Sequence, residues 1–153
     1  MDDPERWLAL AHAPGLHAGT LQAWLAAGSP PPGLLSESDA ALTALGLREQ
    51  AIGALRRPDP AALTADLAWL RGGPARALIG WGTPDYPPLL AQIPDAPLVL
   101  YAEGDPLGLS LPQLAIVGSR NPTGPGRDTA HAFALHVARA GLVVTSGLAL
   151  GID

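Results

Sequence analysis

The feature that most constrains the fold is a pair of apolar runs, each followed by a loop rich in glycine. LAIVG occupies residues 114–118 and LVVTSG occupies residues 142–147, with an amphipathic segment between them. This pattern predicts the order strand, loop, helix, strand, loop. In open α/β sheets, ligands bind beyond the carboxyl ends of the strands. Because both loops follow strand ends, the sequence predicts one pocket lined by two loops.

Composition indicates a globular chain with a packed core, since 48% of the 153 residues are apolar. No apolar run reaches the roughly 18 residues of a membrane-spanning helix. The acidic start MDDPE lacks the cationic region of a secretory signal, so a cytoplasmic location is expected. The chain has no cysteine, which excludes disulfides and thiolate zinc sites.

The charge of the chain argues against a protein that holds polyanions by bulk attraction, because the net charge is −5. The charges are unevenly distributed. Residues 1–70 have eight acidic residues and four arginines, whereas residues 71–153 have six acidic residues and five arginines. A phosphate site must therefore be local, and we expect it in the second half.

Apolar spacing and breakers predict four short helices in residues 1–57, which we expect to form one domain. The expected helices cover residues 5–13, 18–27, a third stretch to residue 46, and 48–55. Ser36 with Asp39 would begin the third helix in the manner of a capping box. The stretch GSPPPG before it cannot continue a helix and is expected to be a linker or rigid turn.

Two segments of this first domain suggest helix-hairpin-helix elements, in which a tight glycine turn directs backbone amides at a DNA phosphate. They are PGLHAGTLQAWL and ALGLREQAIGAL. His17 and Arg48 stand where the usual hairpin has a second glycine, and the region is acidic. A structural or protein-binding bundle is therefore favoured over direct DNA contact.

The sequence RPDP at residues 57–60 indicates a domain boundary, because its two prolines disfavour helix on both sides. Residues 58–153 would form the second domain. Its first part is expected to contain a helix over residues 61–70, strands over residues 75–81 and 98–101, and a short helix with Pro87 near its start.

The first glycine-rich loop, in LAIVGSRNPTGPGR, has the character of an anion site. Gly118 ends the strand, and two more glycines precede a helix expected to begin near Arg127. Glycines allow backbone to approach a ligand closely, and the helix N-terminus offers unpaired amides. Arg120, and Arg127 with it, would add charge-assisted bonds to a phosphate. A purely structural turn is the alternative. The spacing fits neither GxxxxGK[ST] nor GxGxxG, which disfavours an ATP-hydrolysing loop or a standard dinucleotide site.

The second loop, SGLALGID, repeats this logic. Ser146 and Gly147 end the strand, Gly151 would let a helix start close to the pocket, and Asp153 is expected to cap that helix. Neither loop contains a nucleophile with an adjacent base or a pair of carboxylates. His131 and His136 lie five residues apart, which is poor spacing for a shared metal. We therefore expect no catalytic residue, no metal site and no cofactor.

Three linked motifs resemble the DNA processing protein A (DprA/Smf) family. They are YPPLLAQIPDAPLVLYAEGD, LAIVGSRNPTGPG and AGLVVTSGLALGID, which together span residues 86–153. The first 57 residues resemble the SAM-like helical domain of that family more loosely. The resemblance implies an α/β fold, with a four-helix SAM-like bundle followed by a doubly wound Rossmann-like parallel sheet. That sheet would be truncated here, because the family continues with further strands and helices.

The resemblance also implies a function. Members of the family bind single-stranded DNA, protect it and load the RecA recombinase onto incoming strands during natural transformation, and they act as dimers. Arg120 would be the phosphate-contacting arginine, and Leu150 departs from the polar residue common at its position. The implied nucleic-acid-binding residues are Gly118, Ser119, Arg120, Asn121, Thr123, Gly124, Gly126, Arg127, Ser146, Gly147 and Gly151.

Two other functions stay open from the sequence. The GSR turn also resembles that of Rossmann-like nucleoside monophosphate phosphoribohydrolases, enzymes in which a comparable loop holds a nucleotide phosphate. Those enzymes carry a PGGxGTxxE motif, which is absent from this sequence. The third possibility is a protein-interaction module that acts through the helical bundle.

Overall fold

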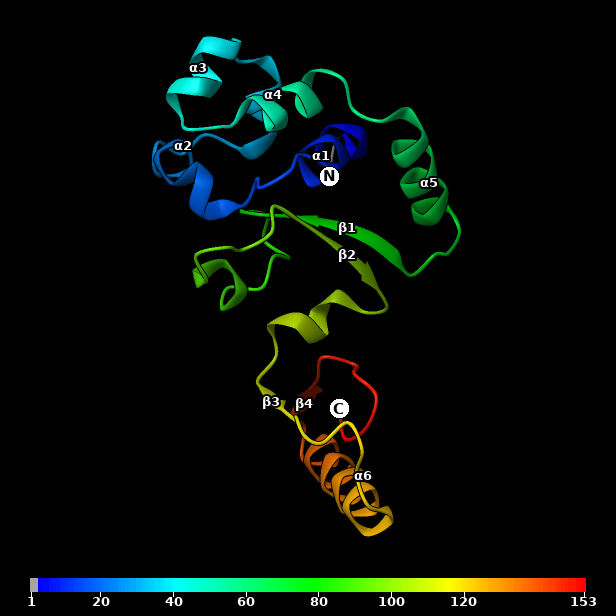
Figure 1. Cartoon of the computed structure of the whole chain (residues 1–153). Helices are drawn as coiled ribbons and strands as arrows, with labels where there is room; N and C mark the ends of the chain where they lie inside the picture. The colour runs from blue at the N-terminus through cyan, green and yellow to red at the C-terminus, as the bar shows by residue number, and fades with distance from the viewer. Residues whose placement is uncertain (1–2) are drawn as a thin grey trace. The chain divides into compact units, whose positions relative to one another are not determined.

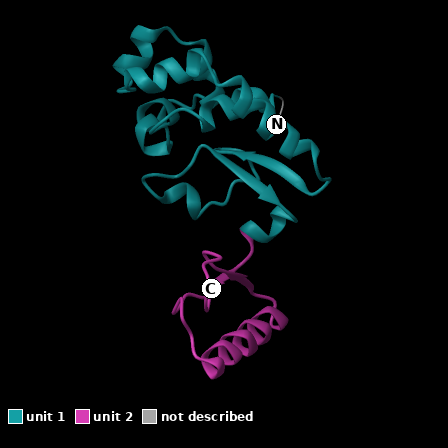
Figure 2. Ribbon diagram, turned by 45° about the vertical axis from the view of Figure 1, so that its right-hand side comes forward, with its two compact units in different colours: residues 1–109 teal, residues 110–153 magenta. Residues whose placement is uncertain are grey.

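The computed structural model describes residues 3–153 and divides into two compact units, residues 1–109 and residues 110–153 (Figures 1 and 2). Each unit contains a two-stranded sheet. Strands β1 (Arg76–Gly80) and β2 (Val99–Glu103) pair antiparallel, whereas β3 (Gln113–Ala115) and β4 (Val143–Thr145) pair parallel. The expected α/β class is confirmed at this level. Across residues 3–153, none of the helices has the length and apolar character needed to span a membrane.

The first unit is mostly helical. Four α-helices precede residue 57, as expected, and a fifth leads into β1 (Figure 1). They are α1 (Pro4–Ala11), α2 (Gln22–Ala26), α3 (Asp39–Ala44), α4 (Glu49–Arg56) and α5 (Pro60–Arg71). Short 3₁₀ segments are η1 (Ala18–Leu21), η2 (Pro31–Ser36), η3 (Leu90–Gln92) and η4 (Pro106–Ser110). Proline begins both α1 and α5, where its missing N–H has no helical partner to lose.

Two local predictions in this unit need correction. The helix expected over residues 18–27 is split, because its first turn is the 3₁₀ segment η1. The proline run, expected to be a linker or rigid turn, leads into the short 3₁₀ segment η2, whose first turn tolerates proline. The third helix is capped by Ser38, whose hydroxyl accepts a bond from the Ala41 amide at 3.2 Å. Ser36 instead ends η2, so the cap lies two residues later than expected.

One apolar core joins the helices to the β1–β2 hairpin. Its fully buried side chains are Leu8, Leu10, Leu21, Leu34 and Leu42. Leu78 of β1 and Leu98, next to β2, belong to the same cluster. Residues on both sides of position 57 therefore share a core within the first unit. The expected domain boundary at that position stays a prediction.

A polar network at the edge of this core ties three elements together. His12, just after α1, places Nε2 2.6 Å from the Asp66 carboxylate of α5. Tyr101 of β2 donates its hydroxyl to the same oxygen at 2.7 Å. Tyr101 also contacts the Trp69 ring edge to face, with ring centroids 5.5 Å apart. Burial raises the pKa of Tyr101, and the hydrogen bond and negative charge of Asp66 raise it further.

The raised pKa of Tyr101 predicts a loss of stability in alkali. An unfolded tyrosine loses its proton near pH 10, whereas the folded one holds it to higher pH. Above about pH 10 the unfolded state therefore binds fewer protons, and the free energy of unfolding falls as pH rises. We expect urea melts of Tyr101→Phe between pH 8 and 11 to show a smaller alkaline decline than the wild type. Equal declines in both proteins would contradict this assignment.

Tyr86 sets a baseline for that experiment. Burial raises its pKa as well, and its hydroxyl donates to the Pro97 carbonyl at 2.7 Å. The Tyr101→Phe variant should therefore keep part of the alkaline decline. The double variant Tyr86→Phe/Tyr101→Phe should lose more of the decline than either single variant, because the two sites contribute separately.

Candidate functional site

The second unit is a strand–helix–strand unit that sets the candidate site. Strand β3 leads through a loop into α6 (Gly124–Arg139), and the chain returns through β4. The strands pair in parallel with Leu114 opposite Val144, and the Ile116 amide continues the ladder by donating to the Thr145 carbonyl at 2.9 Å. Parallel strands end at the same edge of a sheet. The loops over residues 116–123 and 146–153 therefore leave that edge together, as the sequence predicts.

The two loops are in direct contact. The Ile152 amide donates to the Ser119 carbonyl at 3.1 Å, and the Gly118 amide donates to Asp153 Oδ1 at 3.0 Å. Gly151 has a φ of 117°, and a Cβ at this position would overlap the Ser119 carbonyl oxygen. Only glycine permits so close an approach at this backbone angle. The GSR turn and the GID segment thus form one joined structure.

Asp153 has a role that the sequence did not predict. Its carboxylate accepts the Gly118 amide of the other loop, and its expected role as the cap of a following helix stays a prediction. This partner lies 35 residues away in the chain, so local pattern could not find it. The bond also occupies the Gly118 amide. A phosphate at this turn would have to use other donors or displace the carboxylate.

The serines of the two loops play equivalent parts. Ser119 Oγ accepts the Asn121 amide at 3.1 Å, and Ser146 Oγ accepts the Leu148 amide at 3.2 Å. Each hydroxyl therefore closes a tight turn in its own loop. Leu148 has a φ of 52°, which is a strained conformation for a residue with a side chain. Such strain is held only where the surrounding structure requires it.

Helix α6 begins earlier than expected. Thr123 is its N-cap, and the Thr123 hydroxyl accepts the Gly126 amide at 3.2 Å. Gly124 and Gly126 therefore belong to the first helical turn, whereas the sequence placed them in the loop before Arg127. The threonine cap and the proline at position 125 explain the earlier start, because both favour the first turn of a helix. This turn contains no acidic residue, so its positive dipole end is not neutralised there.

Two arginines supply the positive charge of the candidate site. Arg120 and Arg127 are exposed, and neither forms a hydrogen bond or an ion pair through its side chain within residues 3–153. The second unit has three arginines and two acidic residues, whereas residues 1–109 have six arginines and twelve acidic residues. With histidine neutral, the unit that contains the loops therefore has a net charge of +1, whereas residues 1–109 have a net charge of −6. In the described residues, no group of three His, Asp or Glu side chains is arranged to hold a metal ion.

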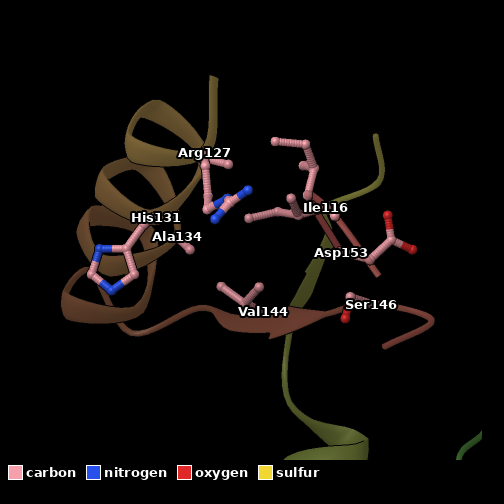
Figure 3. A pocket seen from close by; sticks show the side chains of 10 residues that line it. Ile116, Arg127, His131, Ala134, Val144, Ser146 and Asp153 are labelled. Atoms are coloured by element: carbon pink, nitrogen blue, oxygen red, sulfur yellow. The ribbon is translucent and has the colours of Figure 1, made fainter. Parts of the chain in front are cut away.

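A cavity of about 330 Å³ lies between α6 and the sheet, beside the second loop (Figure 3). Its lining residues are Ile116, Arg127, Ala130, His131, Ala134, Val144, Ser146, Gly151, Ile152 and Asp153. Three predicted site residues are therefore brought together at this cavity, namely Arg127, Ser146 and Gly151. The other predicted residues do not line it: Gly118, Ser119, Arg120, Asn121, Thr123, Gly124, Gly126 and Gly147.

Sequence reasoning missed the apolar wall of this cavity. On α6, the lining residues occupy positions 127, 130, 131 and 134, which is the spacing of one helical face. That spacing is visible in the sequence. The small residues Ala130 and Ala134 on a face turned toward a sheet would have been the signal for an open space.

Comparison with known proteins places this geometry in a family. A family model described as "DNA recombination-mediator protein A" matches residues 77–153. The chain belongs to this family. The match begins in β1 and runs through both strand-end loops, so it includes all three motifs on which the sequence resemblance rests.

Curated relatives agree with the family match. The chain is 45% identical over 69 residues to "DNA processing protein DprA" of Bacillus subtilis, covering 44% of this chain and 23% of that protein. It is 38% identical over 91 residues to "Protein Smf" of Escherichia coli, covering 60% of this chain and 24% of that protein. A "Protein Smf" of Synechocystis is 40% identical over 75 residues, covering 46% of this chain and 19% of that protein. The chain thus spans about a quarter or less of each relative.

Proposed function

We propose that this chain binds the sugar-phosphate backbone of single-stranded DNA at the two strand-end loops and acts in DNA processing for recombination. The observation that supports this most is the direct contact between the loops beside Arg120, whose side chain has no partner in residues 3–153. The family match supports DNA as the ligand, because the family description and the name of a relative refer to DNA recombination and DNA processing.

Each part of the site has a distinct role in this proposal. Arg120 forms charge-assisted bonds to a phosphate, and Arg127 adds charge beside the N-terminus of α6. Ser119, Asn121, Thr123 and Ser146 hold the turns in shape through the hydrogen bonds described above. Gly118 and Gly151 let the two loops approach each other, whereas Gly124, Gly126 and Gly147 would let a ligand approach the backbone.

The whole protein would have a wider role. We propose that it protects incoming single strands during natural transformation, loads the RecA recombinase onto them and acts as a cytoplasmic homodimer. The parallel β3–α6–β4 unit supports a Rossmann-like sheet, and the four helices before residue 57 support a SAM-like bundle. In this proposal the chain is a binding protein without a cofactor and not an enzyme.

Substituting the exposed arginine tests the proposal. We expect Arg120→Ala to weaken binding of fluorescently labelled oligo(dT) several-fold in anisotropy titrations. The loss should be the same for other single-stranded sequences, because phosphates carry no base information. Removal of one phosphate contact should also lower the slope of log K against log salt by about 0.7. An unchanged affinity and slope would rule out Arg120 as a phosphate ligand.

Arg139→Ala is the matched control. Arg139 is in the last turn of α6, at the opposite end of the helix from the strand-end loops, and its substitution removes the same charge. Its effect on affinity should be small.

The rival function, an enzyme that binds a nucleotide phosphate, would be favoured by release of free base from a nucleoside monophosphate incubated with the chain.

A further inference from the structure

We propose that the cavity between α6 and the β3–β4 sheet receives one unstacked nucleobase of the bound strand. This inference rests on the proposed function, because it places the base of a nucleotide whose phosphate lies at the strand-end loops. It adds a reason for the chain to prefer single strands. The cavity is distinct from the GSR turn, none of whose residues lines it.

The size and lining of the cavity fit a nucleobase. Its volume of about 330 Å³ lies at the lower end of the range for small-molecule sites. Ile116 and Val144 of the sheet side and Ala134 of the helix side give it apolar walls (Figure 3), and Ala130 also lines the helix side. A planar, weakly polar base gains by burial between such walls, whereas a hydrated phosphate does not.

The polar groups of the cavity fit the same ligand. Arg127 directs its guanidinium into the space between α6 and Ile116 (Figure 3). A guanidinium plane can stack on the face of any base, so it gives affinity without a strong sequence preference. Ser146 and Asp153 also line the cavity at the side of the second loop, but their side-chain oxygens accept the Leu148 and Gly118 amides and point away from Arg127 (Figure 3), so Arg127 is the polar group that faces a bound base.

The position of the cavity connects it to the phosphate site. Gly151, Ile152 and Asp153 line the cavity, and the same segment bonds to Gly118 and Ser119 of the GSR turn. A strand held at the turn therefore has a base-sized opening next to it. In a duplex, every base is paired and stacked, and removing one from the helix requires free energy. Occupation of the cavity thus favours single-stranded over double-stranded DNA.

Filling the cavity tests this inference. Ala134→Leu places a larger apolar side chain on the cavity face of α6 and keeps a strong helix former. We expect it to weaken binding of oligo(dT) by about tenfold, which is the loss of one stacked base. The matched control is Ala132→Leu, an exposed position of the same helix that does not line the cavity. The control should bind as the wild type does.

Titration with abasic single-stranded DNA distinguishes binding at the base pocket from binding at the phosphate site. The wild type should bind oligo(dT) about tenfold more tightly than an abasic strand of equal length. Ala134→Leu should bind the two strands equally, and Arg120→Ala should weaken both. In a ¹⁵N-correlated NMR titration, the amide chemical shifts of Ala130 and Val144 should change on addition of oligo(dT) and stay unchanged on addition of the abasic strand.

These titrations test the base pocket and the phosphate site separately. If the wild type binds both strands equally, or Ala134→Leu binds as Ala132→Leu does, the base pocket is wrong. The phosphate proposal would still stand in that case, provided that Arg120→Ala weakens both strands. If a correctly folded wild-type chain binds neither strand, both proposals are wrong.

Discussion

Gly151→Ala should abolish the joined arrangement of the two strand-end loops and weaken oligo(dT) binding more than tenfold. The added Cβ would overlap the Ser119 carbonyl oxygen and lie 2.7 Å from the Arg120 Cα. Both neighbours are backbone atoms, so no side chain can rotate away. Relief of the overlap must separate Ile152 from Ser119 and Gly118 from Asp153, which breaks both bonds between the loops. Anisotropy titration with labelled oligo(dT) measures the loss.

Gly141→Ala is the control that separates steric overlap from backbone strain. Gly141 also has a positive φ, 89°, but a Cβ there would meet no atom within 4 Å. Both variants carry the conformational penalty of about 1 kcal/mol for a side chain in this region. Gly141→Ala should therefore lose some stability and keep DNA affinity. Equal affinities of the two variants would show that the contact between the loops is not needed for binding.

The strand-end site was partly predictable from the sequence. Apolar runs followed by glycine located both loops, because strand ends and glycine turns are local features. The Gly118–Asp153 bond was not predictable, since it joins positions that come together only after α6 returns the chain to the sheet. The cavity had a local signal in the spacing of Ala130 and Ala134. Its depth depends on how far the helix lies from the sheet, which a sequence pattern does not specify.

In the helical region too, local features were predictable from the sequence and long-range features were not. Some elements were predictable where proline interrupts apolar spacing, as at residues 57–60 before α5. Exact caps were less certain, because Ser36 and Ser38 are chemically equivalent candidates. Tertiary packing decided between them, since η2 extends to Ser36 and leaves Ser38 to cap α3. The sharing of one core by α1 and the β1–β2 hairpin is likewise a long-range property.

Close packing between α1 and β1 predicts a large effect on stability. The Trp7 ring of α1 lies directly on Gly80 of β1, and a Cβ at Gly80 would come within 2.5 Å of the ring. Trp7 is only 8% exposed, so its ring has little room to move. Gly80→Ala should therefore lower the free energy of unfolding by about 1–3 kcal/mol through overpacking. Urea melts followed by tryptophan fluorescence and circular dichroism measure the change.

A second site and a double variant test the cause of that loss. Gly53 lies inside α4 with no atom within 4 Å of its would-be Cβ, so Gly53→Ala should raise stability by roughly 0.5–1 kcal/mol. The same chemical change thus has opposite signs at the two glycines. Trp7→Leu removes the ring, and Gly80→Ala should cost less stability in that background than in the wild type. If the two losses simply add, the Trp7 ring is not what excludes a side chain at position 80.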